Sequence, residues 1–330
     1  MATGSLNKRE RLARAIHGEV TDRTPVALWR HFPVDDQDPA GLAASTITFQ
    51  RDYDFDFVKV TPASSFCVKD WGADDQWTGN PEGTRDYTHR PIKTPDDWAT
   101  LKPMSPKRGR LGDQVRCLEL LHEAFGQEVP YIQTVFSPLS QARNLVGGEQ
   151  LAVHLRRWPG AVRAALDTIT ETTIDFVQAA RAAGIAGIFF AQQYASHALL
   201  SEPEFRQFGR PYDLRVLEAA AGLWLNVLHL HGEEIMFDAA ADYPAAVVNW
   251  HDRETSPSLA DGLEKVGGAV CGGIRQIETL VKGTPEDIRR EAADALAQTG
   301  GRRFILGTGC VTPTHAPLGN IRAVREFVET

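Results

Sequence analysis

The chain has 330 residues, of which 42% are hydrophobic, so it can bury a large core as two domains or as one α/β barrel. A net charge of -8 provides no basic surface for nucleic acid or for anionic lipid, and we expect neither as a partner. No apolar run approaches the roughly 20 residues of a membrane helix, and the start of the chain lacks the apolar core of a secretory signal. Four cysteines without a C-x-x-C pair are typical of a reducing compartment, so we expect a cytoplasmic protein.

Short apolar runs alternate with helical stretches along the chain. A helix is predicted over residues 7–17, and a longer one over residues 159–183, where apolar residues recur every three or four positions. Near-continuous apolar strands between helices indicate a parallel sheet that is covered on both faces. Eight strands are predicted, over residues 26–29, 57–60, 131–135, 188–191, 225–229, 246–250, 269–272 and 304–306.

Eight strand–helix units are the number found in a (β/α)₈ TIM barrel. We therefore predict a single barrel domain over residues 1–330, with a helix at its amino end, although a doubly wound sheet with an extra domain has the same local pattern. Residues 62–113, after the second strand, form an insertion rich in glycine and proline, which we expect to cross the barrel mouth. Within it, residues 77–90 are predicted to form a hairpin with its turn at residues 80–83.

Polar residues follow the predicted strands at the mouth of the barrel, where the loops of such a fold carry out catalysis. Many of them merely mark the points where buried strands reach solvent, which accounts for most of the Ser, Thr and Gln residues. The histidines and the aspartate after the fifth and sixth strands are less easily explained in this way. The candidates for substrate binding are Trp29, His31, Asn144, Gln192 and Tyr194, and the candidates for catalysis are Arg30, His251 and Asp252.

His229 and His231 lie at the end of the fifth predicted strand, and Cys310 follows the last one. Alternate residues of a strand point to the same face, so the two imidazoles can face one way. Cys310 would complete an N, N, S ligand set of the kind that zinc accepts, with a fourth position open for substrate or water. On spacing alone, three unconnected packing residues remain the more common explanation, and His315 is an alternative ligand.

A series of sequence landmarks extends along nearly the whole chain. They are Thr24-Pro25-Val26 before Trp29-Arg30, Leu200 to Phe205, Phe208 to Tyr212, Gly283 to Ile288, and Gly307 to Cys310 followed by Pro313. The order of these landmarks resembles the uroporphyrinogen decarboxylase family. The resemblance implies a single (β/α)₈ domain, in agreement with the strand count. It also leaves two activities open, because the family includes true decarboxylases and zinc methyltransferases that use methylcobalamin and a thiol.

The decarboxylase branch implies an R-x-x-x-R pair, an Asp, a Tyr and a His in the cleft. Arg30 matches the first arginine, but Val34 stands at the second, and the other three positions fall near Ala63, near Asn144 and at Thr308. One of these five family residues is therefore present in the chain.

The methyltransferase branch implies an H-x-C-G motif and a cysteine in the last glycine-rich loop. His229, Gly232 and Cys310 match this pattern, and His231 takes the place of the motif's cysteine. Imidazole can replace thiolate on zinc, but it makes the site harder and removes a negative charge, which weakens the case for thiol activation.

The resemblance thus implies bound Zn²⁺, methylcobalamin supplied by a separate corrinoid protein, and a small-molecule substrate. Arg30 would hold a carboxylate or phosphate of the substrate through its planar fork. His251 and Asp252 would transfer a proton or orient a ligand histidine. A homodimer is also compatible with the resemblance, although no stripe in the sequence marks an interface.

We therefore predict zinc-dependent methyl transfer to a thiol or similar acceptor. Uroporphyrinogen decarboxylation is the first alternative, favoured by Arg30 and by the overall resemblance. A ligand-binding barrel without turnover is the second alternative.

Overall fold

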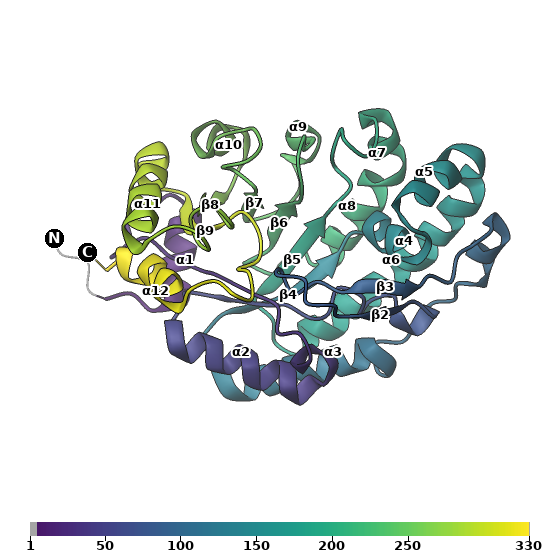
Figure 1. The fold of residues 1–330 in the computed structure, drawn as a ribbon, viewed down its shortest axis with the longest axis horizontal. Coiled ribbons are helices and arrows are strands. Elements are labelled where there is room, and N and C mark those ends of the chain that lie inside the picture. The colour runs from purple at the N-terminus through teal and green to yellow at the C-terminus, as the bar shows by residue number, and fades with distance from the viewer. Residues whose placement is uncertain (1–4, 330) are drawn as a thin grey trace.

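The computed structural model describes residues 5–329, so the outermost ends of the predicted domain, residues 1–4 and 330, lie outside the described part. Seven parallel strands form one curled sheet whose spatial order follows the chain (Figure 1). The α/β barrel class predicted from the strand pattern is confirmed. The strands of this sheet are β1 (Val58–Val60), β4 (Tyr131–Phe136), β5 (Gly187–Gln192), β6 (Val227–Leu230), β7 (Val247–Trp250), β8 (Ala269–Ile274) and β9 (Phe304–Thr308).

The first predicted strand, over residues 26–29, is wrong in extent, because only a single parallel bridge joins Val26 to Leu306. The segment nevertheless contacts both edges of the sheet. The backbone N–H of Ala27 donates to the carbonyl of Leu306 at 3.0 Å, and the N–H of Asp56 donates to the carbonyl of Val26 at 2.9 Å. The N–H of Val26 donates instead to the Asp56 carboxylate at 2.8 Å, and Pro25 has no N–H, so a regular ladder cannot continue here.

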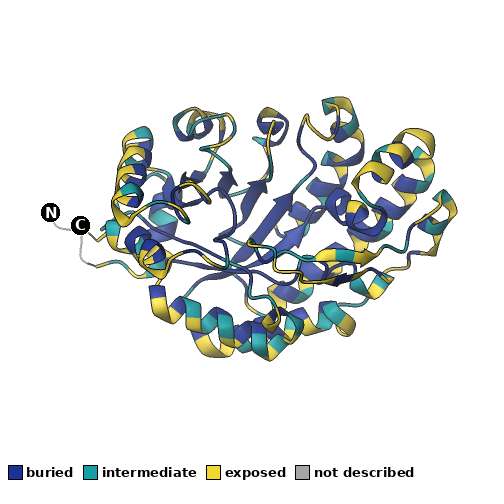
Figure 2. Ribbon diagram, in the orientation of Figure 1, coloured by how far each residue is buried: buried dark blue, intermediate teal, exposed yellow. Residues whose placement is uncertain are grey.

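The sheet strands are buried along their whole length, whereas most of the surrounding helices also have an exposed side (Figure 2). This is the arrangement in which parallel strands are covered on both faces. The two helices predicted above are present as α1 and α6, and no described helix combines the length and the apolar character needed to span a membrane. The α-helices are α1 (Lys8–Ile16), α2 (Pro39–Tyr53), α3 (Gly109–Phe125), α4 (Pro138–Val146), α5 (Gly148–Arg157), α6 (Pro159–Ala182), α7 (Glu202–Phe208), α8 (Arg210–Ala219), α9 (Phe237–Ala240), α10 (Leu259–Lys265), α11 (Pro285–Thr299) and α12 (Leu318–Phe327), and 3₁₀ turns cover Asp35–Gln37, Lys69–Trp71 and Pro95–Thr100.

The insertion after β1 carries an antiparallel hairpin made of β2 (Asp74–Gln76) and β3 (Asp86–His89). Its turn lies at residues 80–83, as predicted, but its first strand begins before residue 77. The turn packs on the barrel mouth, because the Pro81 carbonyl accepts from the Thr314 N–H at 2.7 Å. Gly83 has a φ of +81°, and a Cβ there would lie 2.5 Å from the Cβ of His31, so only glycine allows this close approach.

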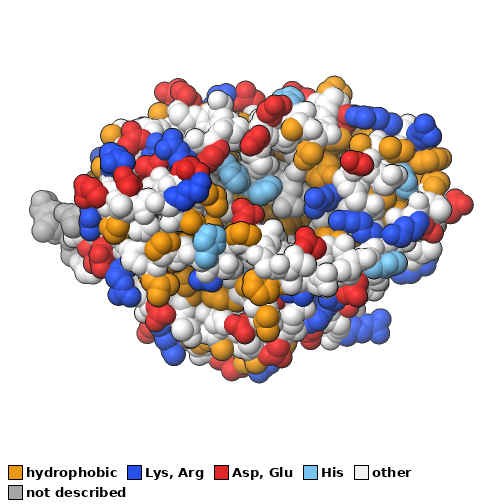
Figure 3. All heavy atoms as spheres, in the orientation of Figure 1, with side chains coloured by type: hydrophobic (Ala, Val, Ile, Leu, Met, Phe, Trp, Pro, Cys, Tyr) orange, Lys and Arg blue, Asp and Glu red, His pale blue; other side chains and the backbone are white. Residues whose placement is uncertain are grey.

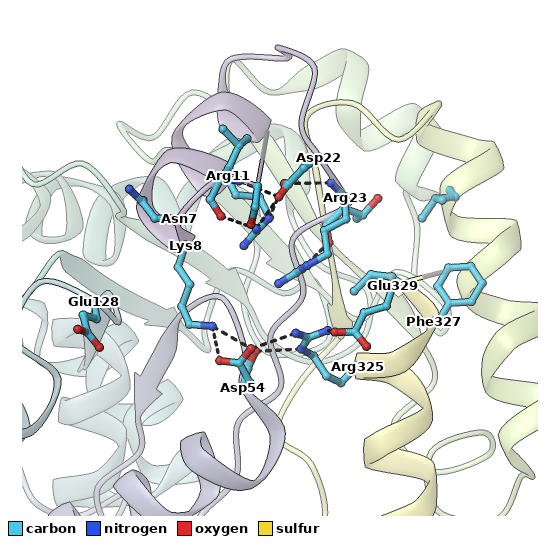
Figure 4. A pocket seen from close by; sticks show the side chains of 15 residues that line it. Asn7, Lys8, Arg11, Asp22, Arg23, Asp54, Glu128, Arg325, Phe327 and Glu329 are labelled. Carbon is cyan, nitrogen blue, oxygen red and sulfur yellow. Dashed lines mark hydrogen bonds and ion pairs between the residues drawn. The ribbon is translucent and has the colours of Figure 1, made fainter. Parts of the chain in front are cut away.

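A cavity of about 940 Å³ lies at the amino-terminal ends of the strands, and we call it the base cavity (Figure 4). Lys8 and Arg325 both bind Asp54 there, at 2.5 and 3.0 Å. Arg11 binds Asp22 at 2.7 Å. Arg23 binds the buried carboxylate of Asp56, also at 2.7 Å, so each Lys and Arg that lines the base cavity has an acidic partner.

Candidate metal centre and active site

His229 lies on β6 and is fixed by a buried asparagine on the neighbouring strand. Its Nδ1 is 2.7 Å from Oδ1 of Asn249. The Asn249 amide donates to the carbonyls of Cys271 and Thr308, at 2.9 and 3.0 Å, which leaves its Oδ1 as the acceptor. His229 therefore carries its proton on Nδ1, and the lone pair of Nε2 is available to bind a metal.

Four possible ligand side chains meet at the carboxyl ends of β6, β7 and β9. The donor atoms of His229, His231, His251 and Cys310 all lie within 4.8 Å of one another. Nε2 of His229 is 3.3 Å from Nδ1 of His231, which is itself 3.4 Å from Nε2 of His251. The Cys310 sulfur lies 4.0 Å from Nε2 of His229 and 3.8 Å from Nδ1 of His231.

This spacing is close to that of a tetrahedral metal site. Ligands that are 2.0 to 2.3 Å from zinc lie roughly 3.3 to 3.8 Å from one another. The separations of 3.3, 3.4 and 3.8 Å lie in this range, whereas the 4.0 Å between Cys310 and His229 exceeds it. Burial lowers the pKa of His231 and lowers that of His229 further, which keeps both imidazoles neutral as metal ligands must be. Three nitrogens and one sulfur are a donor set that zinc accepts.

The cluster opens into a cavity of about 370 Å³, which we call the mouth cavity. Figure 3 shows pale blue histidine side chains beside a hollow near the centre of this face, with blue Lys and Arg side chains close to it. The hairpin of the insertion forms part of the wall. The lining residues include Trp29, His31, Lys59, Glu82, Tyr87, Arg90, Arg143, Asn144, Phe189 and Gln193, together with His229, His231 and Cys310.

Among the predicted substrate-binding residues, Trp29, His31 and Asn144 line the mouth cavity, whereas Gln192 and Tyr194 do not. The Gln192 side chain donates to the buried carboxylate of Asp213 and accepts from the backbone N–H of Tyr194 at 2.6 Å. The backbone carbonyl of Gln192 accepts from the backbone N–H of His231 at 3.0 Å. Gln192 thus supports the backbone of a cluster residue from behind the cavity.

The three predicted catalytic residues lie in different places. Arg30 is outside the cavity lining and donates to the Thr314 carbonyl at 3.0 Å. His251 joins the cluster itself. Asp252 is buried behind it, where its carboxylate accepts from the N–H of Gly273 at 3.1 Å and burial raises its pKa to about 7. The alternative ligand His315 is exposed and is not part of the cluster.

Several residues of the site were not anticipated from the sequence. Asn249 could have been found as the one amide in the apolar run of residues 245–250. Lys59 is a charged residue inside the buried strand β1, which is a similar signal. Arg90 and Arg143 carry no such signal, because only the tertiary structure brings the insertion and α4 to the same cavity.

The fold and this cluster define a barrel of one family. The family model described as "Uroporphyrinogen decarboxylase (URO-D)" matches residues 7–330, and the chain belongs to this family. The methylcobamide:CoM methyltransferase MtbA of Methanosarcina mazei is 25% identical over 236 residues, which are 71% of this chain and 68% of that protein. The methylcobamide:CoM methyltransferase MtaA of Methanosarcina barkeri is 27% identical over 223 residues, 66% of this chain and 63% of the relative.

Other relatives represent the second branch and the fold. A uroporphyrinogen decarboxylase of Mycobacterium sp. (strain KMS) is 28% identical over 244 residues, 68% of this chain and 67% of that protein. A solved methyltransferase from Methanosarcina mazei superposes with a TM-score of 0.82 at 20% identity, covering 98% of this chain and 99% of that one. The predicted family is confirmed, and the relatives include both the methyltransferases and the decarboxylases.

Proposed function

We propose that this chain is a zinc-dependent methyltransferase that moves a methyl group from a corrinoid to a small acceptor. The observation that carries the proposal is the convergence of four metal-binding donor atoms within 4.8 Å at the barrel mouth. A decarboxylase of this family, as the sequence resemblance describes it, has no need of such a cluster. The methylcobamide:CoM methyltransferases among the relatives support the same reaction.

In this proposal His229, His231 and Cys310 would hold the metal, and His251 would be the exchangeable fourth donor beside the acceptor. His251 follows β7, and its Nε2 lies 3.4 Å from Nδ1 of His231, while its ring centre is 6.0 Å from that of His229. A bound zinc ion lowers the pKa of a coordinated thiol or hydroxyl and so makes it a nucleophile at neutral pH. The role of the protein is to orient the ligands, to exclude water and to bind the rest of the acceptor.

The positioning of His229 is the best defined of these tasks. Asn249 holds the Nδ1 proton through a 2.7 Å hydrogen bond, and Phe189 stacks on the imidazole with ring centroids 5.1 Å apart. The ring can therefore neither rotate nor change its tautomer without the loss of a buried hydrogen bond. The methyl donor is proposed to arrive on a separate corrinoid protein. A homodimer and a cytoplasmic location remain predictions.

Decarboxylation of uroporphyrinogen is less well supported. The position of the second family arginine is taken by Val34, whose side chain is exposed and uncharged. Thr308 stands at the position of the family histidine and donates a hydrogen bond to the Cys310 carbonyl. Neither residue offers the charge that a substrate with many carboxylates requires.

Two measurements on the purified protein test the proposal. Elemental analysis is expected to find about one zinc per chain, and incubation with methylcobalamin and a thiol is expected to produce the methyl thioether. A metal-free preparation that transfers methyl groups at the full rate would contradict the zinc site. Formation of coproporphyrinogen from uroporphyrinogen would instead establish the decarboxylase alternative.

A further inference from the structure

Lys59 is a buried cation at the floor of the mouth cavity. It lies on β1 with only 7% of its surface exposed. Its ammonium makes one side-chain hydrogen bond, to Oγ1 of Thr61 at 3.3 Å, and no ion pair with any carboxylate of residues 5–329. A buried charge without a partner is costly, so its presence here calls for a specific reason.

The surroundings of Lys59 are aromatic and cationic. Its Nζ lies 4.5 Å from the ring centre of Phe189 and 5.9 Å from that of Trp29. Burial lowers the pKa of Lys59 to about 7, and the Coulombic effect of Cys310 opposes this shift. The ring faces reduce the cost of the charge by about 0.5 to 2 kcal/mol each, which is less than a carboxylate would contribute.

Two further nitrogen atoms of the mouth cavity lack partners. Nε1 of Trp29 and Nδ1 of His31 are buried, and neither has a hydrogen-bond partner in the described part of the chain. Both residues line the same cavity as Lys59. Because an indole N–H can only donate, Trp29 and Lys59 together require a ligand that offers oxygen acceptors.

The charge of the metal centre points the same way. A divalent zinc ion with one thiolate, Cys310, retains a charge of about +1, and Lys59 adds to it. Arg90 and Arg143 also line the cavity and make no ion pair among the described residues. An anionic ligand is therefore favoured electrostatically in a cavity of low dielectric.

The two arginines are less suited than Lys59 to be the main contact. The guanidinium of Arg90 already donates to the carbonyls of Arg143 and Asn144, and it stacks on Tyr87 at 4.3 Å. Arg143 donates to Oδ1 of Asn144 at 3.1 Å. The Lys59 ammonium retains two unused N–H donors, and the buried N–H of Trp29, whose ring centre lies 5.9 Å from that ammonium, has no partner either.

We propose that Lys59 and Trp29 form a carboxylate-binding subsite next to the metal ligands, so that the substrate is a small carboxylic acid held by its anionic group at the cavity floor. The proposal rests on the proposed function for the identity of the neighbouring metal site. A planar group with two oxygens can accept from both donors, one on β1 and one on the segment after the bridge at Val26. The reacting atom of the substrate then occupies the open metal position.

The subsite is tested by two thiols that differ only at the far end, 3-mercaptopropionate and 3-mercaptopropan-1-ol. Each is titrated calorimetrically into zinc-loaded protein, and the ratio of the two affinities is the readout. Wild type is expected to favour the acid by at least about tenfold, because a hydrogen bond to a charged group contributes roughly 1.5 to 3 kcal/mol. Lys59→Met is expected to bring the ratio within about twofold, and Trp29→Phe to lower it at least about threefold, because one of the two donors to the carboxylate is lost.

Arg143→Gln removes a cation of the same cavity that is not proposed to contact the carboxylate, and it is expected to lower the preference less than Lys59→Met does. A preference that survives in Lys59→Met, or one that is lost only in Arg143→Gln, would overturn the assignment to Lys59. Zinc content and the unfolding temperature are measured on each variant, so that a folding defect is recognised. If Lys59→Met has such a defect, Trp29→Phe provides the test. The titrations are repeated with metal-free protein in order to separate the two proposals. Failure of the purified protein to bind zinc would refute the metal centre. Only an acid-to-alcohol affinity ratio that is the same in Lys59→Met as in wild type would refute the subsite.

Discussion

The two cavities at opposite ends of the barrel are both lined by charged residues, but they differ in how many of their cations have an acidic partner. In the base cavity, Lys8 and Arg325 share Asp54, and Arg11 binds Asp22 at 2.7 Å (Figure 4). In the mouth cavity, Arg85 binds Asp75 at 2.5 Å, but Lys59, Arg90 and Arg143 have no acidic partner within residues 5–329. Charges that hold the fold together neutralise one another, whereas charges kept for a ligand remain unpaired until it binds.

The largest expected effect lies at the base of the barrel, at Asp56. Its carboxylate is fully buried and binds both Arg11 and Arg23 at 2.7 Å. Asp56→Ala leaves Arg23 without a carboxylate partner and Arg11 with Asp22 alone, and we expect a loss of about 3 to 5 kcal/mol in the free energy of unfolding. Urea denaturation measures this loss. Asp54→Asn, which removes a carboxylate that is 62% exposed, is the control and should cost less than about 1 kcal/mol.

At the mouth, the largest expected effect is on metal affinity. His229→Ala removes a proposed ligand. Loss of a residue that only hydrogen-bonds a ligand weakens metal binding by roughly 10- to 100-fold, so His229→Ala should weaken zinc binding by more than this. Competition with a chromophoric chelator measures the affinity. The fold should persist, because the paired charges of the base are untouched. Unchanged zinc affinity in His229→Ala would show that zinc does not bind at the proposed site in the barrel mouth.

Lys59→Met is expected to stabilise the protein even though it removes ligand binding. Replacement of a buried charge by an apolar side chain of similar size often stabilises by about 1 to 4 kcal/mol. Since the folded pKa of about 7 lies below the usual value of 10.5, the unfolded chain binds the proton more tightly between these two values. The stability of wild type should therefore rise relative to the variant from pH 7 towards pH 10.5. Parallel unfolding curves over this range would contradict the assignment of a desolvated ammonium.

The smallest of the four effects is expected at Asn249. Asn249→Ala leaves His229 in the cluster but removes the acceptor of its Nδ1 proton. Zinc affinity should fall by about 10- to 100-fold, the usual cost of losing a partner behind a ligand histidine. Asn249→Asp retains the acceptor and should recover part of the affinity. Equal affinities in both variants would show that the orientation of His229 does not depend on this bond.

The metal cluster shows what local pattern can predict. His229 and His231 are two residues apart at a strand end, and a parallel barrel brings all strand ends to one mouth, so Cys310 could be joined to them from topology alone. The same reasoning missed Lys59 and Asn249, although both are polar residues inside apolar strands. It also predicted too long a first strand. The N–H of Val26 donates to the Asp56 side chain instead of to a neighbouring strand, and local sequence does not reveal a contact between residues 30 positions apart.

The sequence by itself determined the barrel, the family and the three residues proposed to hold the metal, because strand periodicity and strand ends are local properties. Only the tertiary structure decided that His251 joins the cluster, that Arg30 lies outside the cavity, and that Lys59 has no acidic partner. Whether a charge is paired depends on distances between segments far apart in the chain. The mouth and base cavities differ in whether their cations are all paired, and no pattern within a single segment records this property.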